Sequence, residues 1–285
     1  MPVRRSGRLA ALCLAIWAFG LSGCFQVTRP VVKIGLVAPF EGRYRDMGYE
    51  VIYAVRLAVR EANAAGGVAG YSIELLALDD SGDPAMAVTQ AQKIAIDAQV
   101  VGVIGDWLDE TTTAAAPVYA GAGLPLLATT AAPSLDVSAF RLWPKAQTLQ
   151  AQMPEAAAPT DGPLSWGQTP FFTVDDQGVR LLAPAPMPDD SADPAFAARF
   201  HAIANGVEPN AYSVLAYDAA RLLLDALARD VATAHGAPTR AGEAAALLQS
   251  DYHGLSGPIQ FDAQHNWVEA RGWLYRSQDG QIVRP

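Results

Sequence analysis

The chain has 285 residues, 51% of them hydrophobic and 17% charged, which is enough for one large domain or two smaller lobes. Its formal net charge at pH 7 is −9. This acidic balance disfavours a basic patch of the kind that binds phosphate backbones, so no nucleic-acid partner is expected.

The first residues have the pattern of a secretory signal. Arg4, Arg5 and Arg8 form a basic segment, and residues 9–21 form an apolar run. A helix needs about 20 apolar residues to cross a bilayer, and this run is shorter. A signal peptide over residues 1–24 therefore explains it better than a transmembrane helix.

The apolar run ends in "LSGC", which resembles the lipobox of bacterial lipoproteins. There the signal is cleaved just before a cysteine that becomes lipidated, so the resemblance implies lipidation at Cys24. An uncleaved anchor and an ordinary secretory signal with a chance cysteine are the alternatives. Without the signal, 17 basic residues stand against 29 acidic ones, a formal charge of −12. Cys13 leaves with the signal, so no disulfide is expected in the folded part.

From residue 31 onward, apolar runs alternate with segments of helical spacing. The predicted strands cover residues 31–40, 71–80, 100–106 and 124–130, and the predicted helices cover 49–67, 85–99 and 111–123. Strands separated by helices of this length predict right-handed βαβ units and a parallel sheet. In such sheets ligands bind beyond the carboxyl ends of the strands.

The alternation breaks after "AFRLWP". Residues 145–178 hold four prolines and little periodicity, which predicts a linker or an irregular crossover. Order resumes in the last third of the chain. The predicted elements there are a strand at 179–186, helices at 195–206, 211–232 and 240–251, and an antiparallel tail over 257–283.

Motifs for catalysis are not found. The segments "GLSGP" and "PLSWG" do not fit the G-x-S-x-G turn of a hydrolase nucleophile. The four histidines are scattered without the spacing of metal ligands, and "DDSGDPAMAVTQ" does not have the glycine and glutamate positions of a calcium loop. The sequence thus predicts a protein that is not an enzyme, with no catalytic residue, cofactor or metal.

Several segments together resemble one family. The pieces "NAAGGVAG", "DDSGDP" and "VYAGAGLP" within residues 31–143, and "AYSVLAYDAARLLLDAL" and "GLSGPIQFD" within 179–285, are similar to type I periplasmic binding proteins. The most similar branch is the Leu/Ile/Val-binding type that serves ABC importers of branched-chain amino acids. The family normally has several further βαβ units between the two matched parts.

This resemblance implies an α/β fold with a three-layer, parallel-sheet lobe over residues 25–144. Residues 145–178 are then the irregular crossover. Residues 179–285 are an abbreviated second α/β lobe with a C-terminal segment that returns to the hinge. A clamshell of this kind closes two lobes over its ligand, so a shortened second lobe would enclose the ligand less completely.

The resemblance also implies a ligand site at the strand ends. In the amino-acid binders, the loop after the third strand offers hydroxyls and backbone amides to the ligand carboxylate, at the positive end of the next helix. The candidate ligand-binding residues in this chain, at these loops and at the start of the 211–232 helix, are Phe40, Glu41, Tyr44, Met47, Trp107, Asp109, Thr111, Thr129, Thr130, Ala131 and Tyr212. Asp109 stands where a serine is usual, and Ala131 where a threonine is common.

Two interpretations of the third loop stay open. Asp109 could face the cleft and select a cationic or hydroxyl-rich ligand, because a carboxylate about 4 Å from a ligand carboxylate costs on the order of 1 kcal/mol or more. It could instead favour the helix start together with Glu110, by about 0.3–1 kcal/mol. Trp107 either forms a wall of the cleft or packs under the linker. Tyr212 either covers a ligand side chain or is a buried helix residue.

The sequence thus predicts a lipid-anchored extracytoplasmic receptor that captures a small polar solute for an ABC importer. Its expected partners are the solute, a transporter permease and the membrane, through its N-terminal lipid. A sensory or interaction lipoprotein on the same scaffold is the alternative. A third possibility is a deletion derivative that binds nothing.

Overall fold

The structure is a computed structural model that describes residues 29–130, 132, 135, 138–145, 148, 180–279 and 281–284. The predicted signal with Cys24, the candidate Ala131 and nearly all of the predicted crossover lie outside the described residues. Every element below belongs to one compact unit, Val31–Pro285.

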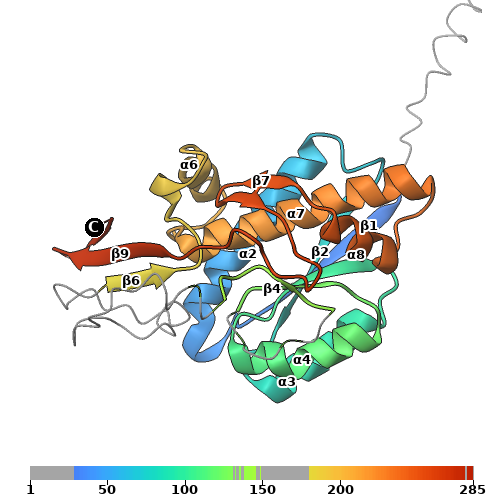
Figure 1. Cartoon of the computed structure of the whole chain (residues 1–285), viewed down its shortest axis with the longest axis horizontal. Coiled ribbons are helices and arrows are strands. Elements are labelled where there is room, and N and C mark those ends of the chain that lie inside the picture. Colours follow the sequence, from blue (N-terminus) through green and yellow to red (C-terminus); the bar gives the residue numbers. More distant parts are fainter. Residues whose placement is uncertain are drawn as a thin grey trace, which may run out of the picture. The chain divides into compact units, whose positions relative to one another are not determined.

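A five-stranded sheet in the order β2-β1-β3-β4-β5 is the centre of this unit (Figure 1), and all its neighbouring strands are parallel. The strands are β1 (Val31–Ala38), β2 (Ser72–Asp79), β3 (Val100–Gly105), β4 (Leu126–Ala128) and β5 (Phe140–Arg141). The four predicted strands and their parallel pairing are confirmed. The fifth strand was not predicted.

Helices cover both faces of this sheet, so the unit has three layers (Figure 1). On one face α3 packs against α4, and their apolar residues form one core with that side of β3 and β4. On the other face α2 packs against α7, which also contacts α8. The helices are α2 (Arg45–Ala64), α3 (Pro84–Ala95), α4 (Asp109–Gly121), α7 (Ala211–Ala234) and α8 (Arg240–Leu248).

The position of α7 differs from the expected division of the chain. Its sequence was placed in the second lobe, whereas the helix lies on the first sheet. Leu223 of α7 sits over Gly102 of β3, where a Cβ atom would come within 2.8 Å of the leucine side chain. Most residues of α7 are buried. A helix that is apolar on nearly all sides needs cover all round, and here α2, α8 and the sheet supply it.

The remaining elements are short. They are a 3-10 turn at Gly42–Tyr44, β6 (Arg180–Ala183), a 3-10 turn at Pro188–Asp190, α6 (Phe196–His201), β7 (Tyr252–Gly254), β8 (Gly257–Ile259), β9 (Trp273–Gln278) and β10 (Gln281–Val283). A second sheet has the order β10-β9-β6, and β7 pairs with β8. All three strand pairings are antiparallel, which agrees with the predicted antiparallel tail.

Helix α7 begins at a capping box. The Asn210 side chain accepts from the backbone N–H of Tyr212 (2.9 Å) and of Ser213 (3.3 Å), and the Ser213 hydroxyl accepts from the Asn210 N–H (3.3 Å). These bonds satisfy helix N–H groups that have no partner inside the helix. They also fix the backbone that carries Tyr212.

Replacing this cap gives a local stability test. We expect Asn210→Ala to lower the free energy of unfolding by about 1 kcal/mol, because the first N–H groups of α7 lose their acceptor. Asn210→Ser keeps a good capping oxygen and should retain most of the stability. Urea denaturation of the two variants measures the difference. An equal loss in both would mean that the cap is not what Asn210 contributes.

Candidate functional site

The carboxyl ends of the central strands meet at one edge of the sheet. Gly105, at the end of β3, has a φ of +144°, and a Cβ atom there would lie 2.6 Å from the carbonyl oxygen of Val37. Only glycine allows β3 to end this close to β1. The loops that follow β1, β2, β3 and β4 are therefore brought together.

Asp79 ties the first two loops. Its Oδ1 accepts from the N–H of Phe40 (2.7 Å), Ser81 (2.9 Å) and Glu41 (3.3 Å), and its Oδ2 accepts from the Ser81 hydroxyl (2.6 Å). Partial burial opposes the charge, but these hydrogen bonds outweigh it and lower the pKa of Asp79. Asp79 is thus a charged anchor of the edge.

The candidates of the first loop differ in access. Phe40 and Tyr44 are half-buried and Glu41 is exposed, so all three can be reached from solvent. Met47 is fully buried among core side chains. Met47 therefore packs in the core beneath the first loop, and its thioether is not exposed at the sheet edge.

The third loop is mostly turned inward. Trp107 is 1% exposed, and Thr111 is fully buried with its hydroxyl donating to the Leu108 carbonyl (3.1 Å). Asp109 is the first residue of α4 and is half-buried, while Glu110 is exposed. The N-cap residue Leu108 offers no side-chain acceptor, so the carboxylates supply the negative charge in this first turn.

Next to the third loop lies a cation that the sequence reading missed. The Arg141 Nη1 donates to the carbonyl oxygens of Ala132 (2.6 Å) and Thr130 (3.5 Å). Burial lowers the pKa of Arg141, and the Asp109 carboxylate works against that shift. The edge therefore holds an arginine charge that offsets Asp109, which weakens the argument that Asp109 repels an anionic ligand.

Aromatic side chains gather around Tyr212. The Tyr212 ring lies 6.2 Å from Trp107, edge to face, and 6.3 Å from Trp143, stacked. All three residues are buried, and neither the two indole N–H groups nor the phenol oxygen has a hydrogen-bond partner within the described part of the chain. Such donors are costly unless something accepts from them. The group thus suits a ligand that carries acceptor oxygens.

Trp143 was also missed by the sequence reading, although "RLWP" places a tryptophan directly after the last strand of the sheet. Of the fourth-loop candidates, Thr129 and Thr130 are fully buried. The Thr129 hydroxyl has no partner among the described residues, and the Thr130 hydroxyl accepts from the Ala132 N–H at 3.4 Å. The structure therefore brings Trp107 and Tyr212 together and adds Arg141 and Trp143 to the same edge.

Two buried carboxyls lie beneath the loops. Asp106 is fully buried, and neither of its carboxyl oxygens has a hydrogen-bond partner among the described residues. Burial, and then the nearby Asp80, raise the pKa of Asp106 well above its ordinary value. Burial raises the pKa of Asp80 to about 6. Both groups favour their neutral forms, which removes negative charge from the edge at mildly acidic pH.

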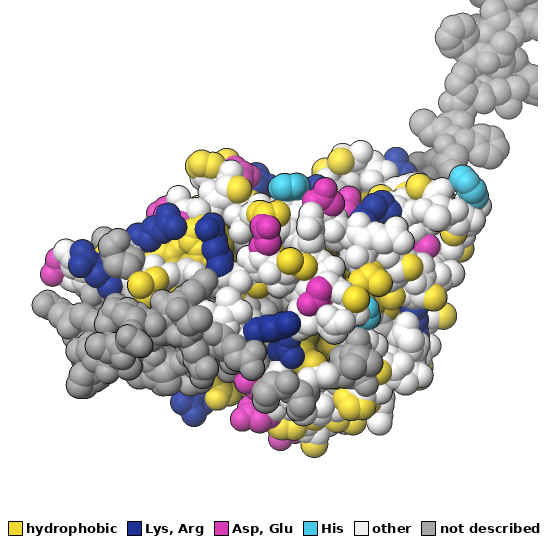
Figure 2. Space-filling view, viewed as in Figure 1, with side chains coloured by type: hydrophobic (Ala, Val, Ile, Leu, Met, Phe, Trp, Pro, Cys, Tyr) yellow, Lys and Arg dark blue, Asp and Glu magenta, His cyan; other side chains and the backbone are white. Residues whose placement is uncertain are grey.

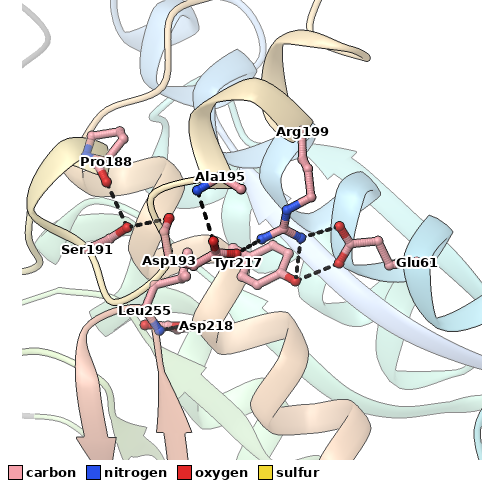
Figure 3. A network of polar contacts seen from close by, with 9 residues as sticks. All are labelled: Glu61, Pro188, Ser191, Asp193, Ala195, Arg199, Tyr217, Asp218 and Leu255. Atoms are coloured by element: carbon pink, nitrogen blue, oxygen red, sulfur yellow. Dashed lines mark hydrogen bonds and ion pairs between the residues drawn. The ribbon is translucent and has the colours of Figure 1, made fainter.

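A second polar cluster holds α6 in place (Figure 3). The Arg199 guanidinium pairs with Glu61 and with Asp193, and the Tyr217 hydroxyl donates to Glu61 (2.6 Å). A hollow of about 230 Å³ beside it is lined by Arg199, Tyr217 and Tyr252, among others. The Arg199 charge is already paired with the two carboxylates, so we interpret the cluster as a structural contact that holds α6 against α2 and α7.

Two further searches cover the described part of the chain alone. Within it, no helix is both long and apolar enough to cross a membrane. Nor do any three His, Cys, Asp or Glu side chains of those residues come together as a metal site would require.

A layered parallel sheet with a donor-rich aromatic group at its carboxyl edge is typical of binding lobes. A family described as "Periplasmic binding protein" matches residues 31–166 and 173–281. The chain therefore belongs to the periplasmic binding protein family, and the predicted family and fold class are confirmed.

Relatives in this family match only in part. An "Amino acid binding protein" of Pseudomonas aeruginosa is 31% identical over 33% of this chain and 25% of its own length. The "Leu/Ile/Val-binding protein" of Escherichia coli K12 is 29% identical over 39% of this chain and 30% of its own length. These alignments thus span about a third or less of the length of the relatives.

Solved structures agree on the fold. A substrate-binding protein of an ABC transporter from Desulfitobacterium hafniense, in complex with Leu, has a TM-score of 0.71 at 18% identity, covering 88% of this chain and 99% of its own. A substrate-binding periplasmic protein from Ralstonia solanacearum has a TM-score of 0.72 at 17% identity, covering 89% and 100%. At such low sequence identities, the similarity supports a shared fold only.

Proposed function

We propose that this chain is an extracytoplasmic solute-binding protein that captures a small polar solute, of the amino-acid class, for an ABC importer. The main support is the aromatic group at the sheet edge, where three buried donors have no acceptor among the described residues. An amino-acid carboxylate offers such acceptors. Capture is non-covalent, so no residue is assigned a catalytic role.

The contacts at the edge divide between the two ends of such a ligand. The indole N–H groups of Trp107 and Trp143 and the Tyr212 hydroxyl would hold the acceptor oxygens. Asp109, whose carboxylate interacts with the Arg141 charge, would stand nearest a ligand ammonium. Thr129 lines the remaining strand end in this proposal, and Phe40 and Tyr44 form its solvent side.

The cellular setting is part of the proposal. Lipidation of Cys24 would hold the chain at the outer face of a cell membrane, and a transporter permease would receive the solute. One acyl chain gives only reversible membrane binding, and the lipidated cysteine of such proteins carries more than one. The support for this step is the basic and apolar order of residues 1–24.

A sensory or interaction lipoprotein is the second candidate. It is favoured by the shortness of the second part: in the described residues, the second sheet has three strands, and α7 and α8 pack on the first sheet. A lobe of this size leaves little surface for closing over a solute. Such a module would have the same fold but would bind a partner protein and not a transported solute.

A thermal-shift screen separates the two candidates. We expect residues 25–285 to be stabilised by one class among amino acids, polyamines, sugars and aromatic acids. A ligand at 100 times its dissociation constant adds about 2.7 kcal/mol. A cooperative melt that no compound moves would favour the interaction module, and the absence of a cooperative melt would indicate a chain that does not fold.

The same screen tests the role of Asp109. We expect Asp109→Ser to weaken binding of an amino acid about threefold to tenfold, if Asp109 faces the ligand ammonium, with little change in the melt of the free protein. Glu110→Gln, one residue along and exposed, is the matched control. Stronger binding of anionic ligands in Asp109→Ser alone would show that the carboxylate repels them instead.

A further inference from the structure

An exposed hollow on the second sheet carries two arginine side chains. It has a volume of about 250 Å³ and is lined by Arg271, Gly272, Trp273, Leu274 and Arg284. Figure 2 shows Lys and Arg side chains on two sides of a hydrophobic hollow at the left of the molecule, over the start of β9. The hollow is formed by the start of β9, the two residues before it and Arg284 after β10, and not by the parallel sheet.

Both guanidinium groups pack on one indole. The Cζ atom of Arg271 lies 4.3 Å from the Trp273 ring centroid, and that of Arg284 lies 5.0 Å from it. Trp273 itself is 8% exposed and belongs to the core, so its ring is held in place by packing beneath the two guanidinium groups. Cation–π contacts of this length hold the charged groups in place while they stay accessible to solvent.

The two charges are incompletely compensated. Arg271 has no carboxylate within ion-pair distance among the described residues, and it is exposed. Arg284 has Asp190 at 3.6 Å, which is too long for a hydrogen bond, and that carboxylate already accepts from the Tyr275 hydroxyl at 3.0 Å. Two neighbouring cations with one distant anion leave a local positive field on an otherwise acidic chain.

We infer that this hollow binds a phosphate-class oxyanion, either free phosphate or the phosphate of a lipid headgroup. The guanidinium fork donates two parallel hydrogen bonds to such oxygens, which an ammonium group does not. Two arginines match the double negative charge of a phosphate monoester. The volume lies below that of a pocket for a drug-sized ligand and suits a small ion or headgroup. This site is independent of the proposed solute site.

Calorimetric titration of residues 25–285 with inorganic phosphate at constant ionic strength tests the inference. Constant ionic strength is needed because exposed charges are screened beyond about 8–10 Å in ordinary buffers. We expect saturable binding that weakens about fivefold to tenfold in Arg271→Gln and in Arg284→Gln. Asp190→Asn removes the competing carboxylate and should strengthen binding about twofold to fivefold.

Arg276→Gln is the matched control. Arg276 is an exposed arginine of β9, the strand that carries Trp273, and it does not line the hollow. Binding of phosphate should be unchanged in this variant. If Arg276→Gln weakens binding as much as Arg271→Gln does, the effect is general charge attraction and the site is refuted. The absence of saturable binding to the unchanged chain would also refute it.

A second experiment distinguishes free phosphate from the phosphate of a lipid headgroup. The same chain is sedimented with vesicles of phosphatidylcholine containing phosphatidic acid, and with phosphatidylcholine alone. Retention that needs phosphatidic acid and is lost in Arg271→Gln assigns the site to a lipid headgroup. Phosphate binding without vesicle retention assigns it to a free ion. Retention that persists in Arg271→Gln and Arg284→Gln would contradict a role of the hollow at the membrane.

Discussion

Replacing Arg240 by methionine is expected to lower the free energy of unfolding by about 3 kcal/mol. The guanidinium donates to four backbone carbonyls, those of Val100 (3.1 Å), Ala122 (3.1 Å), Ala95 (3.0 Å) and Asp97 (2.8 Å). They belong to the ends of α3 and α4 and the start of β3. Carbonyls at helix ends have no partner within the helix and carry partial negative charge.

The shape of the side chain should matter as much as its charge. Arg240→Lys keeps the charge but cannot reach four acceptors, so we expect it to recover less than half of the loss. Arg60→Met, at an exposed position of α2, is the control and should change stability by less than about 0.5 kcal/mol. Thermal or urea unfolding measures all three. Equal stability of Arg240→Met and Arg60→Met would contradict this role of Arg240.

Replacing Asp106 by asparagine is expected to stabilise the protein at pH 8, by about 1–3 kcal/mol. The Asp106 carboxyl is buried without a partner among the described residues. Above the ordinary pKa of an aspartate, folding must either bury its charge or bind a proton that the unfolded chain has released, and both lower the free energy of unfolding. Asparagine is neutral at every pH and nearly the same shape. The gain should therefore depend on pH.

The sign of that dependence follows from the raised pKa. Between the ordinary pKa of an aspartate, about 4, and its raised value, the folded state holds a proton that the unfolded state has released. Stability of the unchanged protein thus falls as the pH rises through this window. Asp80, with a pKa of about 6, adds to the fall up to that pH.

Melting curves from pH 4.5 to pH 8 measure this effect. The advantage of Asp106→Asn should be small at pH 4.5 and grow toward pH 8. Asp189→Asn, at an exposed aspartate, is the control and should follow the unchanged protein throughout. A constant difference between Asp106→Asn and the unchanged protein at all pH values would mean that Asp106 does not titrate in this window.

The sequence predicts those features that short-range patterns determine. Four buried runs predicted β1 to β4, and helical spacing predicted α3. In the structure α3 begins after Asp83, whose carboxylate accepts from the Met86 N–H at 2.8 Å. Because parallel strands end at one edge, the pattern indicated the region of Trp107, whereas Tyr212 was a candidate only through the family resemblance. Their rings do lie together.

Other features depend on contacts between distant segments, which local patterns do not contain. Strand β5 has two residues, too few for any periodicity, so Arg141 and Trp143 had no element to place them. The apolar sides of α7 predicted that the helix is buried, but not which surface covers it. Likewise, the sequence does not show that Gly102 is small because Leu223 of α7 packs on it. The hydrogen bonds of Arg240 span more than 100 residues of chain.

The central claim is that a small solute binds at the sheet edge beside Tyr212. It is tested most directly by equilibrium dialysis of residues 25–285 against leucine, isoleucine, valine, threonine and alanine, the solutes named for a Pseudomonas aeruginosa relative. The account predicts one site per chain for at least one of them. Tyr212→Phe should weaken that binding about tenfold without lowering stability, because it removes a hydroxyl that has no other acceptor among the described residues. Retention of none of the five, or equal retention by Tyr212→Phe, would contradict it.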